Sequence, residues 1–217
     1  GNTQRTGGLI GSVYSDDITV DQCLYSGTIT NPSTQSGGLI GEIEAGKTAK
    51  VTNCCFTGVI NVTAGGYCGA VCGYPQGNIN LSNSYANGSV KVGTANSNGN
   101  GGLIGGFNST TSSTISANLN WLSGFDCSVV TNTGVTIGAI VGKTISGVSL
   151  SNNYRVYALN YTTGNGYALT NDANGKDGAE AAEGVTCQQQ AYALGWSDDI
   201  WKLDNADGYP TLKNLPE

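Results

Sequence analysis

The chain has 217 residues, of which 34 are glycine and 4 are proline; it carries a formal net charge of −6 and contains no histidine. This acidic balance would repel a phosphate backbone, so we expect no nucleic-acid partner. The lack of histidine excludes Cys/His zinc sites and Ser-His-Asp catalysis. No apolar run approaches the roughly 20 residues that a membrane-spanning helix needs, so no such segment is predicted. There is no methionine and no signal peptide, which is expected of a processed chain.

A short glycine-rich word recurs along the chain. "GGLIG" stands at 7–11, 37–41 and 101–105, with the looser copies "GAVCG" at 69–73 and "GAIVG" at 138–142. Its second position is always glycine or alanine, which indicates a close approach or a sharp bend. The next two positions are apolar, so the strand is either buried on both faces or turned by a bulge. We interpret the word as a structural repeat formed by Gly8, Leu9, Gly38, Leu39, Val71, Gly102, Leu103 and Ile140.

A second word follows each copy of the first. It reads "ITVDQCLYSG" at 18–27, "AKVTNCCFTG" at 49–58, "INLSNSYANG" at 79–88, "ISANLNWLSG" at 115–124 and "VSLSNNYRVY" at 148–157. Apolar and polar residues alternate at its start, which predicts a half-buried strand. In the fourth copy this alignment places Ile115 and Ala117 in the two apolar columns. A third apolar segment follows at 28–30, 59–62 and 89–92, so each copy offers three short strands.

A period of 30 to 37 residues is typical of solenoids, propellers and arrays. Propeller blades are longer and have four strands, and the Leu/Asn pattern of leucine-rich repeats is missing. We therefore predict an all-β fold, a parallel β-helix of about five three-strand coils over residues 1–160. A column of amides, Gln22, Asn53, Asn83 and Asn152, could form a hydrogen-bonded ladder along the axis, with Leu119 interrupting it in the fourth copy.

Residues 161–217 lack the repeat and are predicted to form a cap on the last coil, within the same structural domain. Thr186 and Gln189 fit a capping box, so a short helix is expected over 187–194, ending at Gly195. A solenoid needs its open end covered, and four large side chains could cover it: Trp196, Trp201, Tyr209 and Leu212. An aromatic ligand site in this segment is the alternative.

Seven cysteines form an odd set, so at least one lacks an intramolecular partner. Cys23 and Cys54 share a column with Ser84, Asn120 and Asn153 in the predicted register, whereas Cys55 and Cys72 occupy core columns. We therefore expect most of the thiols to be reduced and buried.

No cofactor is predicted. Asp172, Asn174 and Glu183 match three positions of a calcium loop, but Lys176 and Asp177 depart from it, and Asx turns explain the run more simply.

The two words together resemble the GLUG motif of bacterial surface proteins. The resemblance rests on "GGLIG" with "NCCFTG" and "NSYANG", covers roughly residues 5–160, and extends to the Trp-rich ending. It implies membership among large adhesin-like proteins and the non-catalytic part of some IgA-cleaving peptidases. It carries no catalytic residue with it.

Three classes of function remain open. The first is a non-catalytic, extracellular or cell-surface interaction module that binds a protein or glycan, with Tyr14, Tyr67 and Tyr74 in loops where a ring could stack on a sugar. The second is a polysaccharide-binding or polysaccharide-degrading β-helix, for which Asp21, Glu42 and Glu44 are candidate carboxylates. The third is a passive spacer. The sequence does not predict the oligomeric state.

Overall fold

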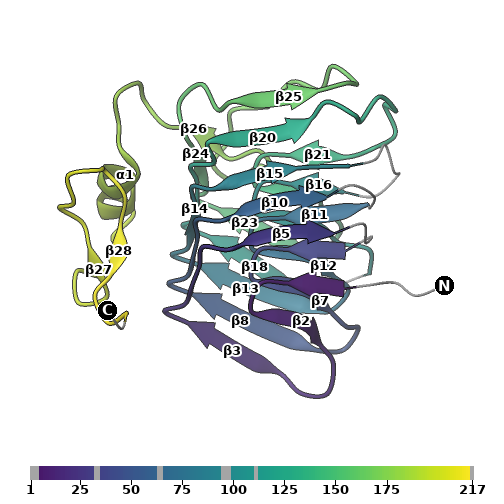
Figure 1. The fold of residues 1–217 in the computed structure, drawn as a ribbon, viewed down its shortest axis with the longest axis horizontal. Coiled ribbons are helices and arrows are strands. Elements are labelled where there is room, and N and C mark those ends of the chain that lie inside the picture. The colour runs from purple at the N-terminus through teal and green to yellow at the C-terminus, as the bar shows by residue number, and fades with distance from the viewer. Residues whose placement is uncertain (1–4, 32–34, 63–65, 94–98, 110–111, 216–217) are drawn as a thin grey trace.

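The structure, a computed structural model, describes residues 5–31, 35–62, 66–93, 99–109 and 112–215. The chain winds through five turns, and each turn contributes one short strand to each of five parallel sheets (Figure 1). This confirms the predicted parallel β-solenoid of about five turns. The number of strands differs, because each turn has five strands rather than three. Both repeated words bend in the middle and so supply two strands each.

The five sheets, A to E, follow one another in chain order within a turn, and turn one comprises β1 to β5. Sheet A contains β1 (Arg5–Gly7), β6 (Gln35–Gly37), β11 (Tyr67–Gly69), β16 (Asn100–Gly101) and β21 (Ile137–Gly138). Sheet B contains β2 (Ile10–Val13), β7 (Ile40–Ile43), β12 (Cys72–Pro75), β17 (Ile104–Gly106) and β22 (Val141–Lys143). Sheet C contains β3 (Ile18–Asp21), β8 (Thr48–Thr52), β13 (Asn78–Ser82), β18 (Ser113–Ser116) and β23 (Val148–Ser151).

Sheets D and E complete each turn. Sheet D contains β4 (Leu24–Tyr25), β9 (Cys55–Phe56), β14 (Tyr85–Ala86), β19 (Leu119–Asn120), β24 (Tyr154–Arg155) and, beyond the fifth turn, β26 (Ala179–Glu180). Sheet E contains β5 (Thr28–Asn31), β10 (Val59–Val62), β15 (Ser89–Lys91), β20 (Gly124–Cys127) and β25 (Tyr161–Thr163). The C-terminal segment adds one helix, α1 (Cys187–Ala193), and a two-stranded antiparallel sheet of β27 (Trp201–Lys202) and β28 (Thr211–Leu212). No helix in the described ranges is long and apolar enough to cross a membrane.

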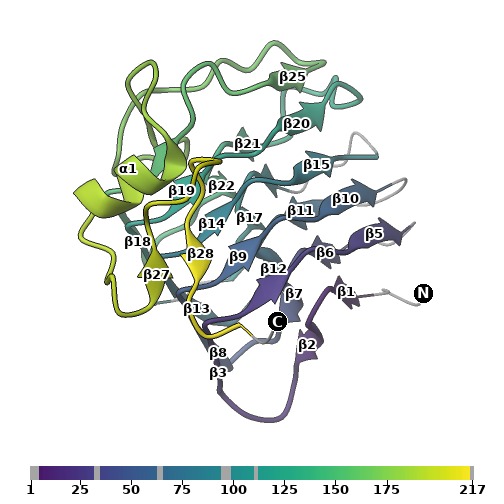
Figure 2. The ribbon, with the colours of Figure 1, turned by 60° about the vertical axis from the view of Figure 1, so that its left-hand side comes forward.

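The glycine word forms the sharp corner between sheets A and B (Figure 2). At this corner two successive N–H groups donate to one carbonyl of the next turn, as Leu39 and Ile40 do to Val71 O. The chain therefore turns by a bulge-like bend, and both apolar residues of the word are buried in turns two to five. The bend brings the fourth carbonyl back over the first glycine: a Cβ at Gly37 would lie 1.8 Å from Ile40 O.

The second position of the word is small because a backbone carbonyl of the next turn and a side chain of sheet D both lie against it. A Cβ at Gly8 would lie 2.6 Å from the Tyr25 ring, and one at Gly38 would lie 2.4 Å from Phe56. In turn three the aromatic column holds Ala86, and there the word itself has Ala70.

A left-handed residue separates sheets C and D in each turn. Gln22, Asn53, Asn83, Ala117 and Asn152 all have φ between 50° and 55°. Asparagine is favoured in this column because it tolerates left-handed backbone. The amide-stacking interpretation was wrong, since Asn53 Nδ2 donates to the Asp21 carboxylate rather than to another amide.

The buried polar ladder lies one column further along. Cys54 N donates to Ser84 Oγ, Ser84 N donates to Asn118 Oδ1, and Asn118 N and Nδ2 donate to Asn153 Oδ1. The predicted register of the fourth copy was therefore wrong by two residues, because Ile115 pairs with Leu81 and Ala117 takes the place expected for Leu119. Ser113 fills the first apolar column instead, buried and accepting a hydrogen bond from Ile79 N.

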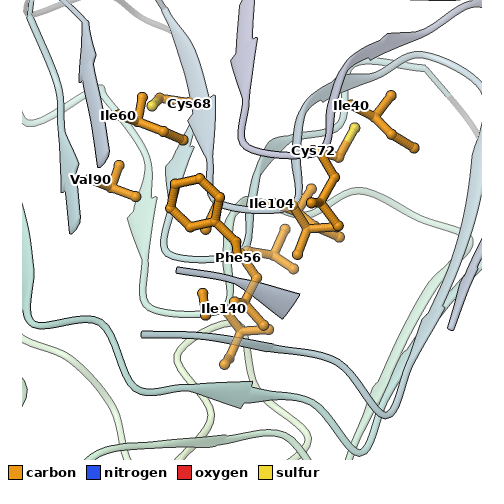
Figure 3. Packing of buried hydrophobic residues seen from close by; sticks show 14 of the residues in the cluster. Ile40, Phe56, Ile60, Cys68, Cys72, Val90, Ile104 and Ile140 are labelled. Atoms are coloured by element: carbon orange, nitrogen blue, oxygen red, sulfur yellow. The ribbon is translucent and has the colours of Figure 1, made fainter. Parts of the chain in front are cut away.

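The core lies inside the solenoid and is built from stacked columns (Figure 3). Phe56 lies between Ile60 of sheet E and Ile104 of sheet B, with Cys68 of sheet A nearby. Parallel, in-register pairing repeats such contacts at every turn, so the buried apolar surface grows with each repeat.

All seven cysteines are free, and all except Cys23 are buried. Burial raises the pKa of Cys54, Cys55 and Cys68 to about 12, which suppresses the reactive thiolate at neutral pH. We therefore expect iodoacetamide to modify at most Cys23 in the native protein and all seven thiols after denaturation without a reductant, as read by mass. Fewer than seven modified thiols in the denatured sample would reveal disulfides and contradict this expectation.

Candidate functional site

The last 30 or so described residues lie on the flank of the solenoid, against sheet D, rather than across its last turn (Figure 1). Trp196 and Trp201 pack together with ring centroids 5.0 Å apart, and Tyr85 of turn three contacts both rings. The rest of this cluster includes Cys55 of turn two and Leu119 of turn four. The predicted cap residues Trp196, Trp201, Tyr209 and Leu212 therefore do cover apolar surface, but the prediction that they cover the last coil was wrong.

Residues that come earlier in the chain, just before β26, cover the open end of turn five. Ile140 N and Val141 N donate to Lys176 O, and Ala139 N donates to the buried Asp177 carboxylate. That carboxylate also accepts from Tyr167 OH and from Thr170. The segment before β26 thus replaces the hydrogen bonds that a sixth turn would make.

Polar anchors fix the flank segment in place. Trp196 Nε1 donates to Ala117 O at 3.1 Å, and Tyr85 OH donates to Pro210 O at 2.7 Å. At the far end Asn214 Nδ2 donates to Gln22 Oε1 of turn one. These contacts reach from turn four to turn one, so the segment is held along most of the solenoid's length.

Helix α1 turns one aromatic ring toward solvent. The capping box at its start is present as predicted, with Gln189 N donating to Thr186 Oγ1 and Thr186 N donating to Gln189 Oε1. The one-turn spacing of Cys187 and Ala191 buries both against the solenoid. Tyr192, next to Ala191, therefore points away, and 76% of its surface is exposed.

Two shallow depressions have Tyr192 in their lining. One, of about 480 Å³, is lined by Tyr192, Asp198, Trp201, Lys202, Leu203, Asp204 and Lys213. The other, of about 580 Å³, is lined by Tyr192, Gly195, Trp196, Ser197 and Asp198. Tyr192 and Asp198 line both. We call this surface, defined by the residues of the two depressions, the Tyr192 site.

The chemistry of the Tyr192 site suits a neutral, hydroxyl-rich ligand. The depression of about 480 Å³ is lined by two acids and two bases, so its charges favour neither anions nor cations. These residues are Asp198, Asp204, Lys202 and Lys213. An exposed phenol ring offers an apolar face with a polar edge. Carboxylate and ammonium groups around it can accept hydrogen bonds from hydroxyl groups or donate to them.

The tyrosines predicted as ligand contacts are placed differently from one another. Tyr14 is 69% exposed in the connection between β2 and β3, as expected. Tyr67 and Tyr74 lie in strands β11 and β12, not in loops, and both are buried. Their rings stack on each other with centroids 4.0 Å apart, so neither face is open to a sugar. For these two residues the prediction was wrong.

The candidate carboxylates of sheet B form an ion-pair cluster. Glu42 is completely buried, pairs with Arg5 Nε and accepts from Gln76 Nε2. Arg5 Nη1 also lies 2.5 Å from Glu44 Oε1. Burial raises the pKa of the Glu42 carboxyl, against the lowering effect of Gln76 and Arg5. These groups join turns one, two and three. Arg5 also lines a depression of about 540 Å³ at turn one, but neither Glu42 nor Glu44 belongs to its lining.

Asp21 likewise holds neighbouring turns together. Its carboxylate accepts from Thr52 Oγ1 and Asn53 Nδ2 of turn two. Desolvation acts to raise its pKa, but the hydrogen bonds from Thr52, Asn53 and Gln22 and the charge of Lys50 lower it on balance. Asp21 is therefore an ionised acceptor rather than a proton donor near neutral pH.

The predicted calcium positions lie in the segment that closes turn five and beyond it. Asp172 Oδ1 accepts from Asn174 N, an Asx turn, and Asn174 Oδ1 accepts from Asn152 N. Glu183 is exposed. Within the described part of the chain, no three His, Cys, Asp or Glu side chains come close enough together to hold a metal ion.

Sequence reasoning missed Tyr192, Asp198 and Lys213. Tyr192 follows an (i, i+4) pair of small buried residues on a predicted helix, and this placement could have marked it as outward-facing. Asp198 and Lys213 are brought together only by the tertiary fold, where Lys213 Nζ donates to Asp198 O.

The chain was compared with known proteins. No protein-family model matches it, and no curated protein does. Among solved structures it is similar to a crystal structure described as "a putative immunoglobulin A1 protease from Bacteroides ovatus", with a TM-score of 0.74 and 19% sequence identity. The similarity covers 97% of this chain and 64% of that one. At this identity the comparison shows the β-solenoid fold alone.

Proposed function

We propose that the protein is a non-catalytic, adhesin-like interaction module, extracellular or at a cell surface, and that its Tyr192 site binds a neutral glycan. The observation that carries the proposal is the exposed ring of Tyr192, which lines two shallow depressions, one of them with two acids and two bases in its lining. An exposed tyrosine can pack its ring on an apolar face of a ligand while its hydroxyl forms a hydrogen bond.

Several observations favour binding over catalysis. Glu42, Glu44 and Asp21 are engaged in contacts between turns, and Glu42 has no access to solvent. Most glycoside hydrolases need two carboxyl groups facing one substrate across a cleft, and Asp198 and Asp204 of the Tyr192 site line a shallow depression instead. The GLUG resemblance supports a bacterial surface role, and the likeness to the Bacteroides ovatus protein supports the same β-solenoid fold.

A screen of immobilised plant, mucin and bacterial glycans tests the proposal. We expect binding to a neutral glycan, and we expect Tyr192→Ala to weaken it about tenfold or more, as truncation of an aromatic anchor does elsewhere. Tyr14→Ala is the matched control, since Tyr14 is similarly exposed but lies between β2 and β3.

The two variants separate the outcomes. Loss of binding in Tyr192→Ala with full binding in Tyr14→Ala supports the assignment. The reverse pattern would place the ligand at the other tyrosine and overturn it. Failure to bind any of the glycans would also overturn it and favour a protein partner or a passive spacer.

A further inference from the structure

The two depressions of the Tyr192 site adjoin each other. Tyr192 and Asp198 belong to the lining of both. Trp201 lines one depression and Trp196 lines the other, and the centroids of their rings lie only 5.0 Å apart. The two depressions therefore form one continuous surface, and Tyr192 and Asp198 stand where they meet.

A fixed pair of indole rings supports this surface. Trp201 is completely buried and Trp196 nearly so, and Trp196 Nε1 donates to Ala117 O of the solenoid at 3.1 Å. Lys213 Nζ donates to Asp198 O and ties together two parts of the lining that are distant in the sequence. A surface built on such groups needs little ordering when a ligand binds.

The Tyr192 site lies on an outer surface rather than in a cleft. All the lining residues of both depressions come from the flank segment, between Tyr192 and Lys213, and none of the described residues of the five turns is among them. Recognition of the end of a chain needs walls that enclose the terminal sugar. An outer surface instead lets a chain enter at one side and leave at the other.

The charged side chains of the site are available to a ligand. Asp198, Lys202 and Asp204 are exposed. Within the part of the chain that the structure describes, Lys213 bonds only the backbone carbonyl of Asp198 and leaves its carboxylate unengaged. Carboxylates accept hydrogen bonds from sugar hydroxyls, and the Lys202 ammonium donates to them.

We propose that the Tyr192 site binds the interior of a linear neutral glycan, which crosses from one depression to the other over Tyr192 and Asp198. This inference rests on the proposed function and adds how the ligand lies. Each depression has the volume of a site for a drug-sized molecule, so the two together take several consecutive sugars. Asp198 contacts every bound chain, whereas Lys202 contacts only chains that reach the depression of about 480 Å³.

Titration calorimetry with linear oligosaccharides of increasing length tests the inference. The probes are β-1,4-linked glucose, mannose and xylose oligomers and α-1,4-linked glucose oligomers, each from one sugar to six. For the series that binds, we expect the affinity to rise about thirtyfold or more from the disaccharide to the hexasaccharide and then to level off. A tag on the reducing end of the hexasaccharide should leave its affinity unchanged, because neither end of the chain is held.

Three variants locate the chain on the surface. Asp198→Asn should weaken the binding of every length alike, by about fivefold or more, because Asp198 lines both depressions. Lys202→Met should reduce the gain from disaccharide to hexasaccharide to less than about tenfold. Lys50→Met is the matched control and should change nothing, since Lys50 is an exposed lysine in β8 of sheet C.

The outcomes separate this inference from the proposed function. A gain with length that Lys202→Met reduces and Lys50→Met preserves supports it. A single sugar that binds as tightly as the hexasaccharide overturns it and leaves the proposed function intact. So does a reducing-end tag that abolishes binding, a gain that Lys202→Met does not alter, or binding in the glycan screen by branched glycans alone. Failure to bind any glycan overturns both.

Discussion

Replacement of Trp201 by alanine is expected to lower the free energy of unfolding by about 3–5 kcal/mol. Trp201 is 0% exposed and contacts both Trp196 and Tyr85, so the truncation leaves a large cavity between the flank segment and sheet D. Chemical denaturation followed by fluorescence measures the change. Tyr192→Ala serves as the matched control and should leave stability within about 0.5 kcal/mol, because its ring is exposed.

Removing everything after Gly184 extends the same test. The truncation uncovers Tyr85 and Leu119 of sheet D and Trp121 just after β19, and each large side chain contributes roughly 1.5–3 kcal/mol of burial. We expect the shortened chain to aggregate or to melt at a much lower temperature, as followed by light scattering during heating. Unchanged melting would mean that the segment is an independent appendage and would contradict the flank contact.

Replacement of Gly37 by alanine is expected to destabilise the solenoid by about 3 kcal/mol or more. The added Cβ would lie 1.8 Å from Ile40 O and 2.7 Å from Gly73 N, and both are backbone atoms that cannot move without disturbing the corner. Thermal and urea denaturation of the purified variant measure the effect.

Gly11→Ala is the control within the same word. Among the described residues, a Cβ there would meet only Arg5 O, at 3.5 Å, because turn two alone packs against turn one. The equivalent Gly41 would contact Gly11 O at 2.5 Å. We therefore expect Gly11→Ala to fold with nearly native stability. Equal tolerance of Gly37→Ala and Gly11→Ala would contradict the close-packed corner.

The repeat predicted the architecture because a solenoid reuses the same contacts in every turn. Five copies of the glycine word were enough to indicate five turns, and the capping box at Thr186 was enough to place α1. The number of strands per turn could not be read in the same way. The bends at the glycine word and at Asn53 interrupt strands that look continuous in the alternation of apolar and polar residues.

The misplaced predictions share a physical cause. The predicted register of the fourth repeat was wrong by two residues because the polar Ser113 occupies the first apolar column and Ile115 the second. The alternation of apolar and polar residues could not reveal this, and only the backbone pairing fixes the register. The Trp-rich ending predicted that this segment covers apolar surface of the solenoid, but it did not predict whether that surface is the last turn or the outer face of sheet D. Tyr67 and Tyr74 were predicted to lie in loops because Gly or Pro residues stand beside them in the sequence, but they lie in β11 and β12 and stack on each other.

Binding without cleavage is tested most directly by incubating the protein with a glycan that it retains and then measuring both bound glycan and released reducing ends or unsaturated products. The predicted result is glycan that is bound, lost on Tyr192→Ala, and recovered intact. Release of products that Glu42→Gln or Asp21→Asn abolishes would contradict it and assign the solenoid a polysaccharide-degrading activity.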